Sequence, residues 1–299
     1  MILVFGGGGQ LGQELARMAG QRKVALATLT RAQADIGDRA AVVEALNAHR
    51  PSLVVNAAAY TNVDRAETET STAFAANAHG PFVLGVACAD AQLPLLHIST
   101  DYVFDGARAR SYLESDPINP INAYGRSKAA GETAVRQAQP RHVILRTSWL
   151  YSEFGNNFLK TMVRLAQERE ELRVVADQNG SPTSTRDLAD AILRIAPRLA
   201  MGEQVWGTYH FTGSGVATWH GFASAIVAAQ APLTGRRPRV TAITTAEFPT
   251  PTRRPANSEL DCSLFEQTFG FRGRPWAEEA AEITQAVVLV QQGRAANVA

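Results

Sequence analysis

Residues 1–12 read MILVFGGGGQLG: an apolar run, Ile2–Phe5, passes directly into a glycine-rich turn and then into a helical pattern. The turn fits the pattern GxGxxG from Gly7 and the pattern GxxGxxG from Gly6. Both patterns continue through Gly9 and Gly12. Glycine lets the backbone turn sharply and approach a pyrophosphate, and the N-terminus of the following helix offers free N–H groups and a positive dipole end. Because the turn directly follows the first predicted strand, it favours a dinucleotide site over a plain glycine turn.

The first two-thirds of the chain alternates short apolar runs with longer mixed segments. The runs, which we interpret as strands, cover residues 2–5, 24–29, 52–56, 93–99 and 142–147. Helical spacing is found over residues 10–19, 39–49, 71–91 and 123–139. This alternation predicts parallel strands joined by right-handed crossovers, and the continuous apolar strands predict a sheet covered on both faces. We therefore expect an α/β, Rossmann-type, doubly wound parallel sheet, with the dinucleotide-binding domain over residues 1–150.

After about Trp149 the pattern becomes less regular. Turn signals cluster at residues 155–157, 179–182 and 213–215, and prolines cluster at residues 249–255. Such clusters mark loops between less regular elements. We interpret residues 151–299 as a smaller, mainly substrate-binding portion that covers the edge of the sheet, with some segments returning to the Rossmann core.

The composition is that of an ordinary globular protein. The chain holds 29 basic and 28 acidic residues, so its net charge is +1, which argues against an electrostatic grip on nucleic acid. The 2 cysteines form no CxxC pattern and the 6 histidines form no HxxxH or HExxH pattern, so we expect neither a disulfide framework nor a catalytic metal site. No stretch resembles a signal peptide or a membrane span. We expect a cytoplasmic protein with no nucleic-acid or membrane partner.

The end of the second predicted strand should meet the adenosine ribose of a dinucleotide. A carboxylate there favours NAD, whereas an arginine favours the 2′-phosphate of NADP. The chain has Arg31 at this position, so we predict NADPH as the cofactor, with NADH possible. A solvated surface arginine is the alternative interpretation. Asp35 and Ile36 follow and are expected beside the adenine.

A hydroxyl-bearing strand end and a Tyr–Lys pair come later in the same part of the chain. Thr100 follows the fourth predicted strand, and Tyr124 and Lys128 stand four residues apart, on one face of the next helix. An ammonium beside a phenol lowers the phenol's pKa from ~10. The phenol can then exchange a proton near neutral pH. We expect these three side chains to surround one substrate oxygen.

Together these features resemble the extended short-chain dehydrogenase/reductase superfamily and, within it, the dTDP-4-dehydrorhamnose reductase family. The glycine turn and the YxxxK pattern are shared by the superfamily. NAAAYT at residues 56–61 and DQNGSPT at 177–183 also carry the likeness. The narrower likeness, to this family in particular, is carried by RTSWLY at 146–151, GNNF at 155–158 and RRPANS at 253–258. The likeness runs along nearly the whole chain.

The resemblance implies an NAD(P)H-dependent oxidoreductase that reduces the C4 ketone of dTDP-4-dehydro-β-L-rhamnose, the last step of dTDP-L-rhamnose synthesis. Tyr124 would donate a proton to the C4 oxygen, Lys128 would bind the nicotinamide ribose and lower the Tyr124 pKa, and Thr100 would hydrogen-bond the C4 oxygen. The implied cofactor-binding residues are Gly6, Gly9, Gln10, Leu11, Arg31, Asp35, Ile36, Ala58, Ala59, Tyr60, Tyr124 and Lys128. The expected substrate-binding residues are Thr100, Asp101, Tyr124, Trp149, Asn157 and Arg254.

Several of these expectations have alternatives. Arg254 fits a substrate diphosphate site and a loop anchor equally well. Trp219 is expected to pack rather than to stack on substrate. Asn77, within the long predicted helix, should face the third strand. One alternative function is that of an epimerase or reductase acting on another nucleotide sugar. Another is that of a non-catalytic regulatory subunit. The presence of both Tyr124 and Lys128 disfavours the second alternative.

Two positions depart from the family pattern. Tyr60 stands where relatives frequently have histidine, so its cofactor contact can differ. Some relatives bind Mg²⁺ at a dimer contact through glutamates. Glu14 matches one of these, but Arg186 stands where another is expected. We therefore leave Mg²⁺ open and expect a monomer or a metal-free homodimer.

Overall fold

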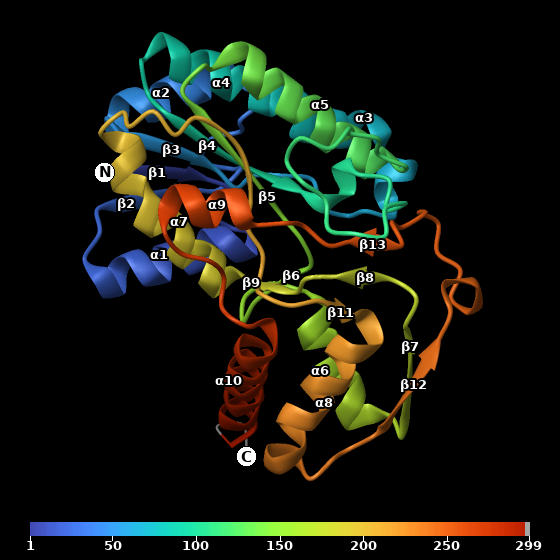
Figure 1. Cartoon of the computed structure of the whole chain (residues 1–299). Helices are drawn as coiled ribbons and strands as arrows, with labels where there is room; N and C mark the ends of the chain where they lie inside the picture. The colour runs from blue at the N-terminus through green and yellow to red at the C-terminus, as the bar shows by residue number, and fades with distance from the viewer. Residues whose placement is uncertain (297–299) are drawn as a thin grey trace.

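The computed structural model describes residues 1–296, and its centre is a six-stranded sheet in which every pairing is parallel (Figure 1). The strand order is β10-β5-β4-β3-β1-β2. The strands are β1 (Ile2–Phe5), β2 (Leu26–Leu29), β3 (Leu53–Asn56), β4 (Leu95–Thr100), β5 (His142–Thr147) and β10 (Gly207–His210). The predicted doubly wound α/β fold is confirmed. The second strand begins two residues later than predicted, because the N–H of Val24 instead closes the preceding helix on the carbonyl of Ala19.

Helices cover both faces of the sheet (Figure 1). One face carries α1 (Gln10–Arg22), α7 (Thr185–Ala200) and α9 (Ser263–Phe269), and the other carries α2 (Arg39–His49), α4 (Gly80–Asp90) and α5 (Ala123–Ala138). Successive residues of a strand point to opposite faces. Val4 therefore packs into the core with Leu15 of α1, whereas Leu3 packs into the core with Leu84 of α4. Burial on both faces explains why β1 is apolar throughout.

The long helix predicted over residues 71–91 is broken in the structure. It consists of α3 (Thr70–Phe74), a π-helical turn (Ala75–His79) and α4. The physical reason lies at Pro81, whose ring nitrogen carries no hydrogen and cannot donate to the carbonyl of Asn77. The turn brings that carbonyl against α5 at Gly131, where a Cβ would lie 2.0 Å from the Asn77 oxygen.

A smaller lobe extends below the sheet in Figure 1. It is built from α6 (Phe158–Glu168), α8 (Trp219–Thr234), α10 (Trp276–Ala296) and the paired strands β7 (Glu171–Val175) and β12 (Arg239–Ile243). Short ladders join it to the sheet: β6 (Leu150–Tyr151) with β9 (Thr183–Ser184), and β8 (Asn179–Gly180) between β11 (Ala217–Thr218) and β13 (Asn257–Ser258). The chain beyond residue 150 also contributes β10 to the sheet edge beside β5, and α7 and α9 to one face. Among the described residues, no helix is both long and apolar enough to cross a membrane.

Candidate active site

The glycine turn brings three backbone segments into close contact. Gly6 has a φ of +96°, and a Cβ there would lie 2.5 Å from the backbone of Ala57, which follows β3. A Cβ on Gly12 would lie 2.4 Å from the Gly6 carbonyl oxygen. Gly9 donates its N–H to the same oxygen at 3.0 Å and precedes α1 without a side-chain cap. The closest backbone approaches therefore fall on Gly6 and Gly12, and a Cβ on Gly7 would lie 2.8 Å from the Thr28 side chain. No side-chain cap covers the first N–H groups of α1, which remain open to a ligand.

A cleft of about 900 Å³ opens at the carboxyl ends of β1, β2 and β3. Its walls include the predicted cofactor-binding residues Gly6, Gly9, Arg31, Asp35, Ile36, Ala58, Ala59 and Tyr60. α3 and the π-helical turn close its far side with Ser71, Ala75 and His79. A glycine cradle that a Cβ would fill, an uncapped helix N-terminus and an arginine beyond β2 fit a dinucleotide phosphate chain and ribose.

Arg31 and Asp35 form an ion pair at the outer end of this cleft. The Nε of Arg31 lies 2.9 Å from Oδ2 of Asp35, and the Arg31 side chain is 82% exposed. The N–H of Gly37 donates to Oδ1 of Asp35 at 2.9 Å. This backbone hydrogen bond, with a smaller contribution from Arg31, lowers the pKa of Asp35 below its ordinary value. The carboxylate is therefore ionised and fixed, while the outer nitrogens of the Arg31 guanidinium face solvent.

Asn77 holds the loop after β3 in place. It is fully buried, and its Oδ1 accepts from the N–H of Tyr60 at 2.8 Å. Its Nδ2 donates to the Tyr60 carbonyl and to Oγ of Ser127 on α5, both at 3.0 Å. The Tyr60 hydroxyl donates to Glu69 at 2.6 Å. Asn77 thus faces the segment after the third strand, as expected, and Tyr60 is anchored by both its backbone and its side chain.

A second cleft, of about 420 Å³, lies beside the first at the ends of β3, β4 and β5. Both clefts include Gly9 and the segment 57–59 in their walls. The second cleft brings together the predicted residues Gln10, Leu11, Thr100, Asp101, Tyr124, Lys128, Trp149 and Asn157. Gln10 and Leu11 therefore face this cleft rather than the first one, and Arg254 is not among the residues of either wall.

The protonation of Tyr124 differs from the sequence-based expectation. Burial raises the pKa of Tyr124 above its ordinary value, the Asp101 carboxylate raises it further, and the Thr100 hydroxyl opposes both. The Lys128 ammonium is buried and donates to the Ile98 carbonyl at 2.7 Å. Burial lowers the pKa of Lys128 to about 8. The predicted lowering of the phenol's pKa is therefore wrong for this structure, and the phenol is protonated, which is the state that a proton donor requires.

Two buried oxygen atoms in the second cleft make no hydrogen bond within the described residues: Oδ2 of Asp101 and Oγ1 of Thr147. The other carboxylate oxygen of Asp101 accepts from Thr100 at 3.0 Å. Burial raises the pKa of Asp101 to about 6. Buried polar atoms without partners are rare, and here they are available to polar groups of a ligand. Thr147 was not among the predicted site residues. The sequence signal that could have identified it is a hydroxyl at the end of an apolar strand, and the strand register pairs it with Thr100.

Trp149 packs between the two parts of the chain. Its φ is +47°, and its ring stacks on Trp219 at a centroid distance of 3.6 Å and an interplanar angle of 10°. Trp219 also donates its Nε1–H to Gln178 at 3.1 Å. A Cβ on Gly180 would lie 2.5 Å from the Trp149 ring, so only glycine leaves this ring its space. Trp219 packs on an aromatic partner, as expected, but it also lines the second cleft.

Asn157 and Gln10 connect the lobe to the start of α1. Oδ1 of Asn157 caps α6 by accepting from the N–H of Lys160 at 3.0 Å. Its Nδ2 donates to Oε1 of Gln10 at 3.0 Å. The amide of Asn157 is therefore committed to this junction. The Asn157 side chain lines the second cleft, and these hydrogen bonds hold it in one position there.

Arg254 lines neither cleft and is fixed by contacts with neighbouring loops. Its guanidinium pairs with Asp64 at 3.0 Å and also donates to Oγ1 of Thr250. Thr252 donates to the carbonyl of Val63 at 3.0 Å, which fastens the same loop to the segment after β3. Of the two interpretations of Arg254, these contacts favour the loop anchor.

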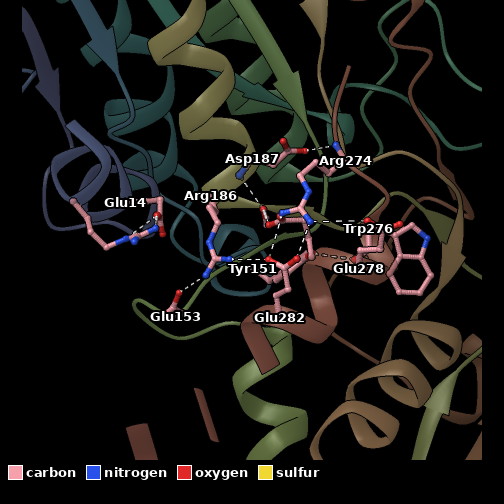
Figure 2. A network of polar contacts seen from close by, with 12 residues as sticks. Glu14, Tyr151, Glu153, Arg186, Asp187, Arg274, Trp276, Glu278 and Glu282 are labelled. Carbon is pink, nitrogen blue, oxygen red and sulfur yellow. Dashed lines mark hydrogen bonds and ion pairs between the residues drawn. The ribbon is translucent and has the colours of Figure 1, made fainter. Parts of the chain in front are cut away.

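Arg186 lies in a network of charged groups between α7, α10 and the loop after β6 (Figure 2). It pairs with Glu153 at 2.8 Å and with Glu282 at 3.1 Å. Glu14 pairs with Arg17. A guanidinium between the two carboxylates supplies the positive charge that a cation would bring. Glu153 and Glu282 are therefore already paired with a positive charge. Among the described residues no group of three or more histidines, cysteines or carboxylates could hold a metal ion.

Comparisons with known proteins find one family along nearly the whole chain. The model of a family described as RmlD substrate binding domain matches residues 1–289. The chain is 44% identical to a dTDP-4-dehydrorhamnose reductase of Sinorhizobium fredii, over 96% of this chain and 98% of that protein. A solved dTDP-4-dehydrorhamnose reductase of Clostridium acetobutylicum superposes with a TM-score of 0.88 at 38% identity, covering 96% of this chain and 99% of that one. The Bacillus anthracis structure, solved in complex with NADP, has a TM-score of 0.84 at 36% identity, covering 94% and 96%.

Proposed function

The chain belongs to the RmlD substrate binding domain family, and we propose that it reduces the C4 ketone of dTDP-4-dehydro-β-L-rhamnose to dTDP-β-L-rhamnose with NADPH. One observation carries the proposal. Tyr124, Thr100 and Lys128 meet in a cleft that adjoins the glycine-turn cleft at the same edge of the sheet. In open α/β sheets, ligands bind at this carboxyl edge of the strands.

The chain's own groups fit the cofactor in the first cleft. The open N–H groups at the start of α1 would hold the diphosphate, since a helix N-terminus favours an anion. Arg31 and Asp35 would stand at the adenosine ribose, and Ala58 and Ala59 along the cleft wall. When bound, NADPH supplies the hydride that reduces the ketone carbon. Because the likeness includes a relative solved with NADP, we propose NADPH as the preferred donor and NADH as a weaker one.

Tyr124 and Thr100 would act on the substrate oxygen. As the carbonyl carbon is reduced, negative charge develops on its oxygen, and donors that converge there stabilise this charge. The Tyr124 hydroxyl would transfer its proton to that oxygen, and the nearby Lys128 ammonium would stabilise the phenolate that remains. The unpartnered oxygens of Asp101 and Thr147 would accept or share hydrogen bonds with sugar hydroxyls.

The direct test is a substrate panel. Purified protein is mixed with NADPH or NADH and with 4-keto sugars linked to dTDP, UDP or GDP, and cofactor oxidation is followed by absorbance. We expect the fastest oxidation with NADPH and dTDP-4-dehydro-β-L-rhamnose, and rhamnose-nucleotide as the product. Interconversion of sugar isomers without net cofactor oxidation would instead identify an epimerase. No turnover of any sugar, together with cofactor binding, would favour a regulatory subunit.

Arg31 should set the preference between the two cofactors. Replacing it by alanine removes a charged partner of the 2′-phosphate, so we expect the Kd of NADPH to rise ~tenfold, while the Kd of NADH changes little. Both constants can be measured by the fluorescence of the reduced nicotinamide, without turnover. The matched control is Arg39→Ala, since Arg39 is exposed, pairs with Asp90 and does not line either cleft. An equal loss of NADPH and NADH affinity in R31A would contradict a role at the 2′-phosphate.

We also propose that the protein works as a monomer or as a homodimer that needs no Mg²⁺, because Arg186 already places a cation between Glu153 and Glu282. A cytoplasmic location accords with the proposed substrates, which are a nucleotide sugar and a reduced nicotinamide cofactor.

A further inference from the structure

A fully buried carboxylate lies one helical turn beyond Lys128. Glu132 on α5 has no exposed surface and accepts four hydrogen bonds. Arg146 donates Nε to Oε1 and Nη2 to Oε2, both at 2.8 Å. Arg136 donates to Oε2 at 2.8 Å and Ser99 to Oε1 at 2.6 Å. A buried charge with this many partners is held in one position, and removing it leaves uncompensated charges behind.

Two partners of Glu132 lie on adjacent strands at the second cleft: Ser99 lines this cleft itself, and Arg146 directly precedes Thr147, which also lines it. Ser99 on β4 is in register with Arg146 on β5, and the next pair in the register is Thr100 with Thr147. Both threonines line the cleft. The carboxylate of Glu132 therefore ties α5 to the ends of β4 and β5 directly beside the proposed reaction site.

Arg146 is itself fixed from two other sides. Its guanidinium lies 5.0 Å above the ring centre of Phe104. Its Nη1 lies 3.3 Å from Nε2 of His210 on β10. Nδ1 of that histidine lies 3.1 Å from the carbonyl of Asp261 and must donate to it, so Nε2 accepts from Arg146. Burial lowers the pKa of His210 to about 3, so the ring is neutral. The Glu132–Arg146 pair is thus held by three strands and one helix.

Tyr124, Lys128 and Glu132 repeat at intervals of four residues along one face of α5. On α5, Tyr124 lies one turn before Lys128, and Glu132 and Arg136 lie one and two turns after it. Of the ionisable groups from the sheet, His97 on β4 is affected by the Lys128 charge, Asp101 lines the same cleft, and Arg146 on β5 pairs with Glu132. Burial lowers the pKa of His97 well below its usual range, so it is neutral. Burial lowers the pKa of Lys128, and the negative charge of Glu132 opposes that effect.

We propose that Glu132 is a positioning residue: clamped by Arg146, it sets α5 against β4 and β5 so that Tyr124 meets Thr100, and its charge keeps Lys128 as an ammonium. The proposal rests on the proposed function for the roles of Tyr124 and Lys128. Its electrostatic part can nevertheless be tested without turnover, because the chain contains only three lysines, Lys23, Lys128 and Lys160.

The first measurement is the titration of Lys128 by NMR in the whole protein labelled with ¹³C at lysine Cε. Lys128→Arg identifies its signal, and Lys23 and Lys160 serve as internal references. We expect a wild-type midpoint near the pKa of about 8. Glu132→Gln removes the opposite charge and should lower the midpoint by ~1 pH unit, whereas Arg136→Gln removes a like charge and should raise it. Arg39→Gln, remote from the cluster, should leave it unchanged.

The second measurement is the pH dependence of turnover. We expect the alkaline limb of kcat to move in the same direction as the Lys128 midpoint in each variant. In E132Q we also expect kcat to fall ~tenfold or more, with little change in the Kd of NADPH. A merely structural role would lower kcat equally at every pH and leave the midpoint where it was.

Identical Lys128 midpoints in wild type, E132Q and R136Q would overturn the proposal. If E132Q does not fold, R136Q decides, because the Arg136 side chain is partly exposed and its loss leaves the Glu132–Arg146 pair in place. The absence of turnover in wild type would reject the proposed function, while the NMR midpoints would still report whether Glu132 controls the charge of Lys128.

Discussion

Replacing Tyr124 by phenylalanine is expected to lower kcat by ~10²–10⁴-fold, the usual contribution of a positioned proton donor. The ring of Tyr124 still packs edge-on against Tyr102, whose ring centre lies 5.5 Å away, so the cleft should keep its shape. Phenylalanine cannot supply the proton that the reduced oxygen requires. The Kd of NADPH, measured by fluorescence, should change far less than kcat, because Tyr124 lines the second cleft and not the first.

A matched control removes a tyrosine hydroxyl elsewhere. Tyr209 on β10 donates its hydroxyl to the carbonyl of Val205 and lines neither cleft. Tyr209→Phe should therefore lose a little stability, ~1 kcal/mol for one hydrogen bond, and retain turnover. If Y124F turned over dTDP-4-dehydro-β-L-rhamnose at the wild-type rate, Tyr124 could not be the proton donor. The assignment of the second cleft as the reaction site would then also be wrong.

Gly12→Ala should strongly disturb the glycine turn beside the cofactor cleft. The added Cβ would lie 2.4 Å from the Gly6 oxygen and 2.7 Å from the Gly7 Cα, and both contacts are with backbone. Either the turn or α1 has to move. We expect a loss of ~1–3 kcal/mol in the free energy of unfolding, together with a rise of at least ~tenfold in the Kd of NADPH, because the open N–H groups move with the helix.

The control lies at the other end of the same helix. Gly20 is exposed and has nothing within 4 Å of a Cβ position. Gly20→Ala should raise the stability by up to ~1 kcal/mol through helix propensity and leave the Kd of NADPH unchanged. Thermal unfolding and nicotinamide fluorescence measure both effects. Wild-type affinity in G12A would mean that the cofactor does not depend on the geometry of this turn.

Local patterns were sufficient for much of the fold and of the site. An apolar run followed by glycines and a helical pattern identifies the first βα unit, because each signal depends on neighbours in the sequence. The spacing of Tyr124 and Lys128 places both on one helical face for the same reason. The predicted residues Thr100, Asp101, Tyr124, Lys128 and Trp149 do converge on one cleft.

Other features depended on segments far apart in the chain. The stack of Trp149 on Trp219 joins residues 70 positions apart. The break in the long helix depends on Pro81 and also on the close packing of the Asn77 carbonyl against Gly131 of α5. Thr147 became visible as a site residue only when the register set it beside Thr100. Sequence spacing carries no information on such pairs, because the sheet order and the loops of the lobe decide which strand ends meet.

By itself, the sequence determined the doubly wound sheet, the glycine turn and the identity of the tyrosine and lysine, because these follow from local periodicity, backbone freedom and side-chain chemistry. Only the tertiary structure decided which way the pKa of Tyr124 shifts and which side chains hold Glu132. The physical reason is that a pKa depends on burial and on the charges nearby. Asp101 and Arg146 reach these groups through strand pairing and helix packing, which no short stretch of sequence specifies.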